Sequence, residues 1–253
     1  MIEAGKSHRA LGAEAATQAT MDPGLRAYMQ SIYNKVAGGL LVAAAFAYAT
    51  SSVPGVREHL VTVAATGASP HAPVLTGLGV GVALAPLLAV VFVGQVLRRP
   101  TAARTGALYW GVAALVGASL GLLTLQFSGA SIATAFAVSA FGFGALSLFG
   151  YATRRDLTAL GGFLLMGAMG LIASLILNLL LHSPLIASVI NAVGVLVFGG
   201  LVAHDTQRLK LGYAASAGDP GAMAVATNCG ALSLFLNFIN LFQFLLLMSG
   251  DRR

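Results

Sequence analysis

The sequence predicts an all-α, polytopic integral membrane protein with seven transmembrane helices. Of its 253 residues, 57% are hydrophobic and only 9% are charged, whereas about 25% of the residues of a soluble domain are charged. The apolar residues form long segments, each able to cross a hydrocarbon core of about 30 Å as a helix. The basic residues lie mainly in short loops between these segments, where they set orientation in a membrane, so nucleic acid is not expected as a partner.

The chain divides into a polar tail and a membrane domain. Residues 1–32 are mixed and lack the continuous apolar core of a secretory signal, so they predict a cytoplasmic N-terminal tail ahead of a seven-helix domain at residues 33–253. The Pro-containing segment between the first two spans is expected to form the longest loop. The expected spans are 36–52, 74–96, 105–125, 131–149, 157–181, 185–205 and 222–248.

Two local patterns predict how these helices pack. Only His182-Ser183-Pro184 separates the fifth span from the sixth, so these two are expected to be antiparallel neighbours. Gly77-x-x-x-Gly81 in the second span is typical of close helix packing, because small residues let two helices approach each other in lipid.

The distribution of Lys and Arg predicts the orientation. Eleven of the 14 lie on the side of the N-terminal tail and three on the other. By the positive-inside rule the N-terminus is cytoplasmic and the C-terminus is outside. The same count places His204, Asp205, Arg98 and Arg99 at the cytoplasmic face.

Asp205 is the only acidic residue within an expected span, at the end of the sixth. An ionisable group there costs roughly 2.5 to 3.5 kcal/mol on insertion scales, which favours a functional role with a charged partner. We expect Arg98 or Arg99 to pair with it, because an unpaired carboxylate beside hydrocarbon tends to be protonated. The alternative is that Asp205 only marks where the helix leaves the membrane beside Arg208 and Lys210.

The last span carries a polar stripe. At about 100° per residue, Ser233, Asn237 and Asn240 fall on one helix face. Lipid disfavours such a face, so it should lie against protein or a wet cavity. The stripe is equally consistent with an ion path and with interhelical hydrogen bonds that only hold the helices together.

Several runs resemble the transmembrane Bax inhibitor motif family, with its bacterial YccA-like members. They are GGLVAHDTQRLK at 199–210, ALSLFLNFINLF at 231–242, and LRAYM at 25–29 with Tyr33-Asn34 before the first span. The resemblance covers roughly residues 25 to 248. It implies seven helices, with two three-helix layers around a central C-terminal helix, and a location in the bacterial inner membrane. Several members of the family are proton-sensitive calcium leaks, so the resemblance implies this activity here.

The sequence departs from the family pattern at two positions. Many members have an aromatic residue before the Asp of the sixth helix and a second Asp in the last helix, where this chain has His204 and Asn237. Two close carboxylates share a proton and titrate as a coupled unit, and Asn237 cannot do this. Its carbonyl oxygen can still accept from a protonated Asp205 or bind a hard cation, so a polar contact between the sixth and seventh helices is expected.

The leading interpretation is a pH-sensitive calcium leak, which is not an enzyme and has no permanent cofactor. Calcium prefers 6 to 8 oxygen ligands, so Asp205 with a few amide and hydroxyl oxygens would hold it weakly and transiently. His204, with an unperturbed pKa of about 6.5, could add a second charge change. The candidate residues of the ion path or gate are Asp205, Asn237, His204, Arg98, Arg99, Asn240 and Ser233.

Two other functions remain open. One is a non-transporting regulator that binds membrane proteases or cell-death and stress partners. The other is an intramembrane serine protease, because Ser119 and His204 resemble the residues of a rhomboid dyad, although Gly117-x-x-x-Gly121 equally predicts helix packing around Ser119. The five His are scattered without a His-Glu-x-x-His motif, and the single Cys229 reads as a small core residue.

Overall fold

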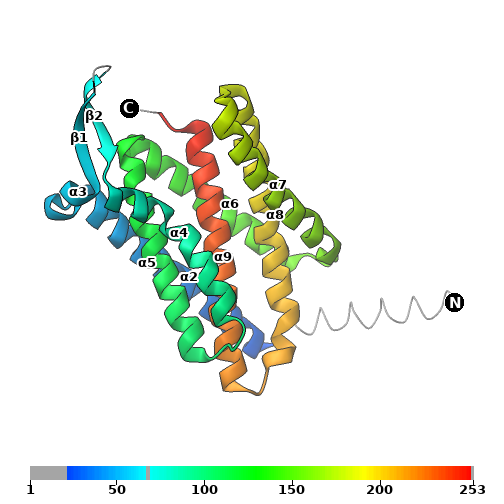
Figure 1. Cartoon of the computed structure of the whole chain (residues 1–253). Helices are drawn as coiled ribbons and strands as arrows, with labels where there is room; N and C mark the ends of the chain where they lie inside the picture. Colours follow the sequence, from blue (N-terminus) through cyan, green and yellow to red (C-terminus); the bar gives the residue numbers. More distant parts are fainter. Residues whose placement is uncertain (1–21, 67–68, 252–253) are drawn as a thin grey trace.

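A computed structural model describes residues 22–66 and 69–251 of the chain (Figure 1). Six helices in this part are long and apolar enough to cross a membrane, which confirms a helical, polytopic membrane protein. They are α2 (Pro23–Ser52), α5 (Ala102–Gly121) with the 3-10 turn η1 (Leu122–Leu125), α6 (Gly129–Ala152), α7 (Thr158–Leu181), α8 (Pro184–Ser216) and α9 (Pro220–Ser249).

The expected second span is also helical. Helix α4 (Gly77–Val96) has twenty residues, begins after a Thr76 side chain that accepts from the Gly79 N–H, and contains Pro86. It packs on α5. Its crossing of the membrane as a seventh span stays a prediction.

Helix α2 begins earlier than expected. The sequence predicts a polar tail up to residue 32, but the helix starts at Pro23, where the Asp22 side chain accepts from the Gly24 N–H at 2.7 Å. An Asp cap followed by Pro at the first helical position is a strong helix start. The remainder of the expected tail, residues 1–21, lies outside the described residues.

The segment expected to be a long loop contains regular structure. A short helix, α3 (Pro54–Leu60), leads into an antiparallel hairpin of β1 (Val61–Thr66) and β2 (Ser69–Leu75), with Val61 opposite Leu75. The hairpin projects from the end of the bundle at which α9 ends (Figure 1). Pro and Gly interrupt the transmembrane helices here, but they do not prevent the two strands from pairing.

The turn between α7 and α8 is as tight as expected. His182 has φ of 51° and ends α7 in the left-handed conformation, and Ser183 caps α8 through the Ile186 N–H. The two helices pack against each other, which confirms the antiparallel pair.

Helix α9 is the most buried of the six spans and α7 the least. Helix α9 packs on α2, α5, α6 and α8, and these helices almost fully enclose its Leu234, Phe235 and Phe238. In Figure 1, α9 runs through the bundle with α2, α4 and α5 to one side and α7 and α8 to the other. Its polar stripe therefore lies against protein rather than lipid.

The two Gly-x-x-x-Gly patterns have different outcomes. A methyl group on Gly117 would overlap the Ala43 backbone, and one on Gly121 would overlap the Ala47 carbonyl, so this pair brings α5 onto α2. A Cβ on Gly77 or Gly81 would meet no described atom within 4 Å, so the close packing expected there is wrong.

Candidate functional site

Helix α8 carries Asp205 into the protein interior. The expected span ended at this residue, but the helix continues for eleven more residues to Ser216, so Asp205 lies within the helix. Its exposed fraction is only 6%. The carboxylate is therefore a buried group and does not mark the helix end.

One carboxylate oxygen of Asp205 binds α9. Its Oδ2 accepts hydrogen bonds from the Ser233 hydroxyl and from Asn237 Nδ2, the latter at 2.9 Å. Ser233 and Asn237 are one helical turn apart and so share a face of α9. The expected polar contact between these two helices is present, and it centres on Asp205.

The other oxygen faces the charged side chains of its own helix. Oδ1 lies 3.2 Å from His204 Nδ1 and 3.4 Å from Arg208 Nη2. Helices α6, α7 and α9, which pack on α8, contain no Asp, Glu, Lys, Arg or His. Helix α2 also contacts α8 and carries Arg26 and Lys35, but Lys35 donates to Asn228 and neither forms an ion pair with Asp205. The basic partners of Asp205 in the described part of the chain therefore come from α8 itself.

The expected pairing of Asp205 with Arg98 or Arg99 is wrong. Both arginines are exposed in the turn after α4, and α4 packs on α5 rather than α8. Arg208 takes their place because residues three apart on a helix lie on the same face. The signal for this partner was the spacing Asp205-x-x-Arg208 itself.

His204 connects Asp205 to a cavity. The cavity has a volume of about 350 Å³, and His204 lines it while its Nδ1 contacts the carboxylate. On the α7 side the imidazole fills the space left by Gly161, where a Cβ would overlap Nε2. The cavity is lined by Thr158, His204, Gln207, Arg208, Leu211 and Gly212.

Asn240 does not join this network. Its Nδ2 donates to the Leu236 carbonyl of its own helix at 2.9 Å. The predicted stripe thus divides, because Ser233 and Asn237 bind Asp205 and Asn240 binds backbone.

Polar residues that the sequence did not single out hold α8 against α6. Thr206 is hydrogen-bonded to Ser147 at 2.9 Å, and Lys210 donates to the Tyr151 carbonyl at 2.9 Å. Gln207 binds the loop after α6, accepting from the Leu157 N–H and donating to the Arg155 carbonyl. Thr206, Gln207 and Lys210 belong to the same run as Asp205, but their partners are distant in sequence and need the fold to be seen.

The protease arrangement is not formed. The Ser119 hydroxyl donates to the Val116 carbonyl, and the His204 ring binds Asp205. No hydrogen bond joins Ser119 to His204, and Ser119 sits in the segment where Gly117 and Gly121 pack on α2. Within the described ranges, no group of three or more His, Cys, Asp or Glu could hold a metal ion.

Comparison with known proteins identifies the family of the chain. Residues 25–253 match the family described as Bax1-I, inhibitor of apoptosis-promoting Bax1. The chain belongs to the Bax inhibitor family. This membership confirms the resemblance read from the sequence.

Three relatives align over about nine tenths of the chain. An uncharacterized protein of Caulobacter vibrioides is 51% identical over 92% of each chain. The inner membrane protein YbhL of Escherichia coli is 35% identical over 91% of this chain and 94% of its own. An uncharacterized membrane protein of Streptococcus pyogenes is 31% identical over 90% of this chain and 94% of its own.

Proposed function

We propose that this Bax inhibitor family protein is a cation leak, with Ca²⁺ as the expected ion, whose path runs between α8 and α9 and is closed at Asp205. The observation that supports this most is the buried carboxylate itself, which accepts from Ser233 and Asn237 across the helix interface. An ion that enters between the helices would compete with these donors for the same oxygens. Carboxylate, amide and hydroxyl oxygens are the ligands that Ca²⁺ prefers.

The leak is proposed to respond to pH through Asp205 and His204. A protonated Asp205 loses its charge attraction to Arg208 and accepts hydrogen bonds less strongly. The contact of Asp205 with Ser233 and Asn237, here called the closed contact, therefore weakens. His204 reaches both the carboxylate and the cavity, which gives protons a route inward from the end of the bundle. With Asn237 in place of a second Asp, the response rests on one carboxylate and one imidazole.

We place the protein in a bacterial inner membrane, as the name of the Escherichia coli relative suggests for that protein. Counting α4, seven helices cross the membrane, with the N-terminus in the cytoplasm and the C-terminus outside. Helices α2, α4 and α5 form one layer, α6, α7 and α8 the other, and α9 lies between them. The contacts of α9 with both groups support this layering.

Flux into liposomes tests the proposal. Purified protein is reconstituted with a Ca²⁺ indicator inside, and uptake is measured between about pH 6 and 8, the interval around the reference pKa of His. We expect uptake above that of empty liposomes, a dependence on pH, and a flattened pH response in Asp205→Asn. His204→Phe should have a smaller effect.

Asp156→Asn is the matched control. It removes one carboxylate from the exposed loop before α7, where hydrogen bonds from Thr158 lower the pKa of Asp156. The control should keep the wild-type pH profile. Flux equal to that of empty liposomes at every pH would instead favour the regulator, which binds membrane proteases or cell-death and stress partners without transport.

A further inference from the structure

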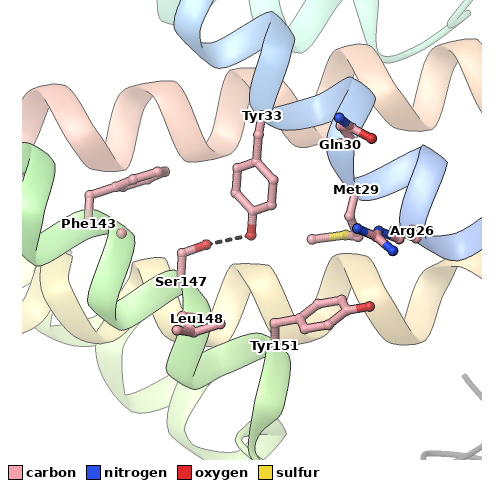
Figure 2. Close-up of a pocket in the computed structure, with 9 residues that line it drawn as sticks. Arg26, Met29, Gln30, Tyr33, Phe143, Ser147, Leu148 and Tyr151 are labelled. Atoms are coloured by element: carbon pink, nitrogen blue, oxygen red, sulfur yellow. Dashed lines mark hydrogen bonds between the residues drawn. The ribbon is translucent and has the colours of Figure 1, made fainter. Parts of the chain in front are cut away.

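A second site lies on the flank of the bundle, between α2 and α6. It is a groove of about 620 Å³, separate from the cavity beside His204 (Figure 2). Its volume falls within the range of about 300 to 1,000 Å³ that is typical of small-molecule sites. The groove is lined by Arg26, Met29, Gln30 and Tyr33 of α2 and by Phe143, Gly144, Ser147, Leu148 and Tyr151 of α6.

The groove is amphipathic along its length. Figure 2 shows Arg26 and Tyr151 toward one end and Phe143 at the other, with the Tyr33–Ser147 hydrogen bond between them. Arg26 is in the first turn of α2 and Tyr151 in the last turn of α6, so the polar end coincides with the helix ends. From Tyr151 to Phe143 the groove extends about 12 Å into the bundle at 1.5 Å per residue.

The polar end of the groove is positively charged. No acidic residue lines it, and the exposed Arg26 forms no ion pair with any described residue. The carboxylate of Asp22, four residues earlier, accepts from the Gly24 N–H. Behind the groove, the buried Lys210 ammonium lies 5.2 Å from the centroid of the Tyr151 ring.

We propose that this groove binds an anionic phospholipid from the leaflet at the basic end of the bundle. The phosphate lies at Arg26, the glycerol and ester oxygens face Gln30 and Tyr33, and the upper acyl chain packs on Met29, Phe143 and Leu148. A lipid fits because the groove opens on the flank of a membrane-spanning bundle, where lipid surrounds the protein. A small soluble anion would leave the apolar part of the groove unfilled.

The proposed lipid site touches the helix that carries Asp205. Tyr33 is hydrogen-bonded to Ser147 at 2.5 Å, and Ser147 to Thr206 at 2.9 Å. Thr206 is the residue after Asp205. Two hydrogen bonds, Tyr33–Ser147 and Ser147–Thr206, therefore link the lipid site to the residue beside Asp205. Lipid binding at this site does not require that the protein conduct ions.

Fluorescence quenching by brominated lipids tests the proposal. Trp110 is the only tryptophan, so Trp110→Phe with Phe143→Trp places a single reporter in the groove. The protein is reconstituted in vesicles of phosphatidylcholine that contain a few per cent of brominated phosphatidylglycerol or brominated phosphatidylcholine. We expect the anionic lipid to quench more strongly at equal content.

Arg26→Gln should weaken this preference about fivefold, which corresponds to one basic side chain near a membrane surface. Arg104→Gln is the matched control, because Arg104 is exposed in the first turn of α5, at the same end of the bundle, but lines a different hollow, the one between α4 and α5. It should leave the preference unchanged. Native mass spectrometry of the wild type and Arg26→Gln, which keep Trp110 and Phe143, should show more retained anionic lipid on the wild type.

Three outcomes would overturn the proposal. Equal quenching by the two lipids would mean that the groove has no anionic preference. An equal effect of Arg104→Gln would assign the preference to general surface charge. Displacement of the brominated lipid by millimolar glycerol phosphate would show that the site takes a soluble phosphate.

Discussion

Asp205 is held by neighbours of three kinds: hydrogen-bond donors on α9, an imidazole, and a guanidinium one turn along its own helix. The sequence predicted the carboxylate and its α9 partners, because a helix face of polar residues in a membrane needs a protein neighbour. It did not predict the arginine. Counting the charges on each side of the membrane predicts only the depth of Arg98 and Arg99. Whether they contact Asp205 depends on which helices pack together, and the charge count does not specify this.

Asn237 and Asn240 provide a matched pair for the contact between α8 and α9. Asn237→Ala removes a donor from a buried carboxylate, whereas Asn240→Ala removes a side chain that binds its own helix. We expect Asn237→Ala to lower the free energy of unfolding by about 1 kcal/mol, since polar contacts between membrane helices average about 0.6 and reach about 1.7. Denaturation in mixed detergent micelles measures the difference. If both alanine variants lose the same stability, the bond to Asp205 contributes nothing specific.

Arg208→Gln separates charge from packing. The Arg208 side chain is 60% exposed, so its loss should cost little stability, as is usual for exposed ion pairs. The closed network nevertheless loses its guanidinium, and we expect greater Ca²⁺ uptake at about pH 8, the upper end of the interval around the His reference pKa. Arg98→Gln, which changes an exposed arginine away from Asp205, should match the wild type in the same liposomes. Equal uptake by all three proteins would remove Arg208 from the closed state.

At the scale of elements, long apolar segments were predictable and their exact ends were not. The apolar pattern of the sixth expected span ends at Asp205, but α8 continues through the polar residues that follow. Gln207 and Lys210 hold this part of the helix in place by hydrogen bonds to backbone atoms at the end of α6 and in the loop after it. The start of α2 was available in the sequence as Asp22-Pro23. The hairpin β1–β2 had no comparable signal, since β2 contains Pro70 and Pro73 and therefore resembles a loop.

The glycine patterns lead to a paired test of helix packing. Gly117→Ala places a methyl group against the Ala43 backbone and should lower the free energy of unfolding by about 1 to 3 kcal/mol, as overpacking does. Gly81→Ala enters open space on α4 and should be neutral or stabilising by up to about 1 kcal/mol, because Ala is the better helix former. Thermal unfolding of the two purified variants in one detergent compares them. A stable Gly117→Ala protein would mean that α5 and α2 can separate at little cost.

At the scale of the whole molecule, composition indicated that the chain lies in a bilayer, and the distribution of basic residues predicted an orientation that stays a prediction. Neither could reveal the groove between α2 and α6, because its lining residues are far apart in the chain and each half looks like an ordinary membrane helix. The same holds for the cavity beside His204, which α8 forms together with Thr158 at the start of α7. Hollows between helices follow from packing, which periodicity does not specify.

The orientation and the role of α4 can be tested together by cysteine labelling. Cys229 is the only cysteine, so Cys229→Ser gives a background without thiols. Single cysteines then replace the exposed residues Arg57, Arg98, Arg155 and Asp251. A membrane-impermeant maleimide added to intact cells, with the outer membrane made permeable, should label positions 57 and 251 only.

The comparison of Arg57→Cys with Arg98→Cys isolates α4, because α4 is the one long helix between these two positions. Two spans separate position 98 from position 155, and three separate 155 from 251, so those positions report orientation whether or not α4 crosses. If α4 spans the membrane, positions 57 and 98 differ in labelling. Equal labelling at 57 and 98, with 155 and 251 still on opposite sides, would make α4 re-entrant and leave a bundle of six spans.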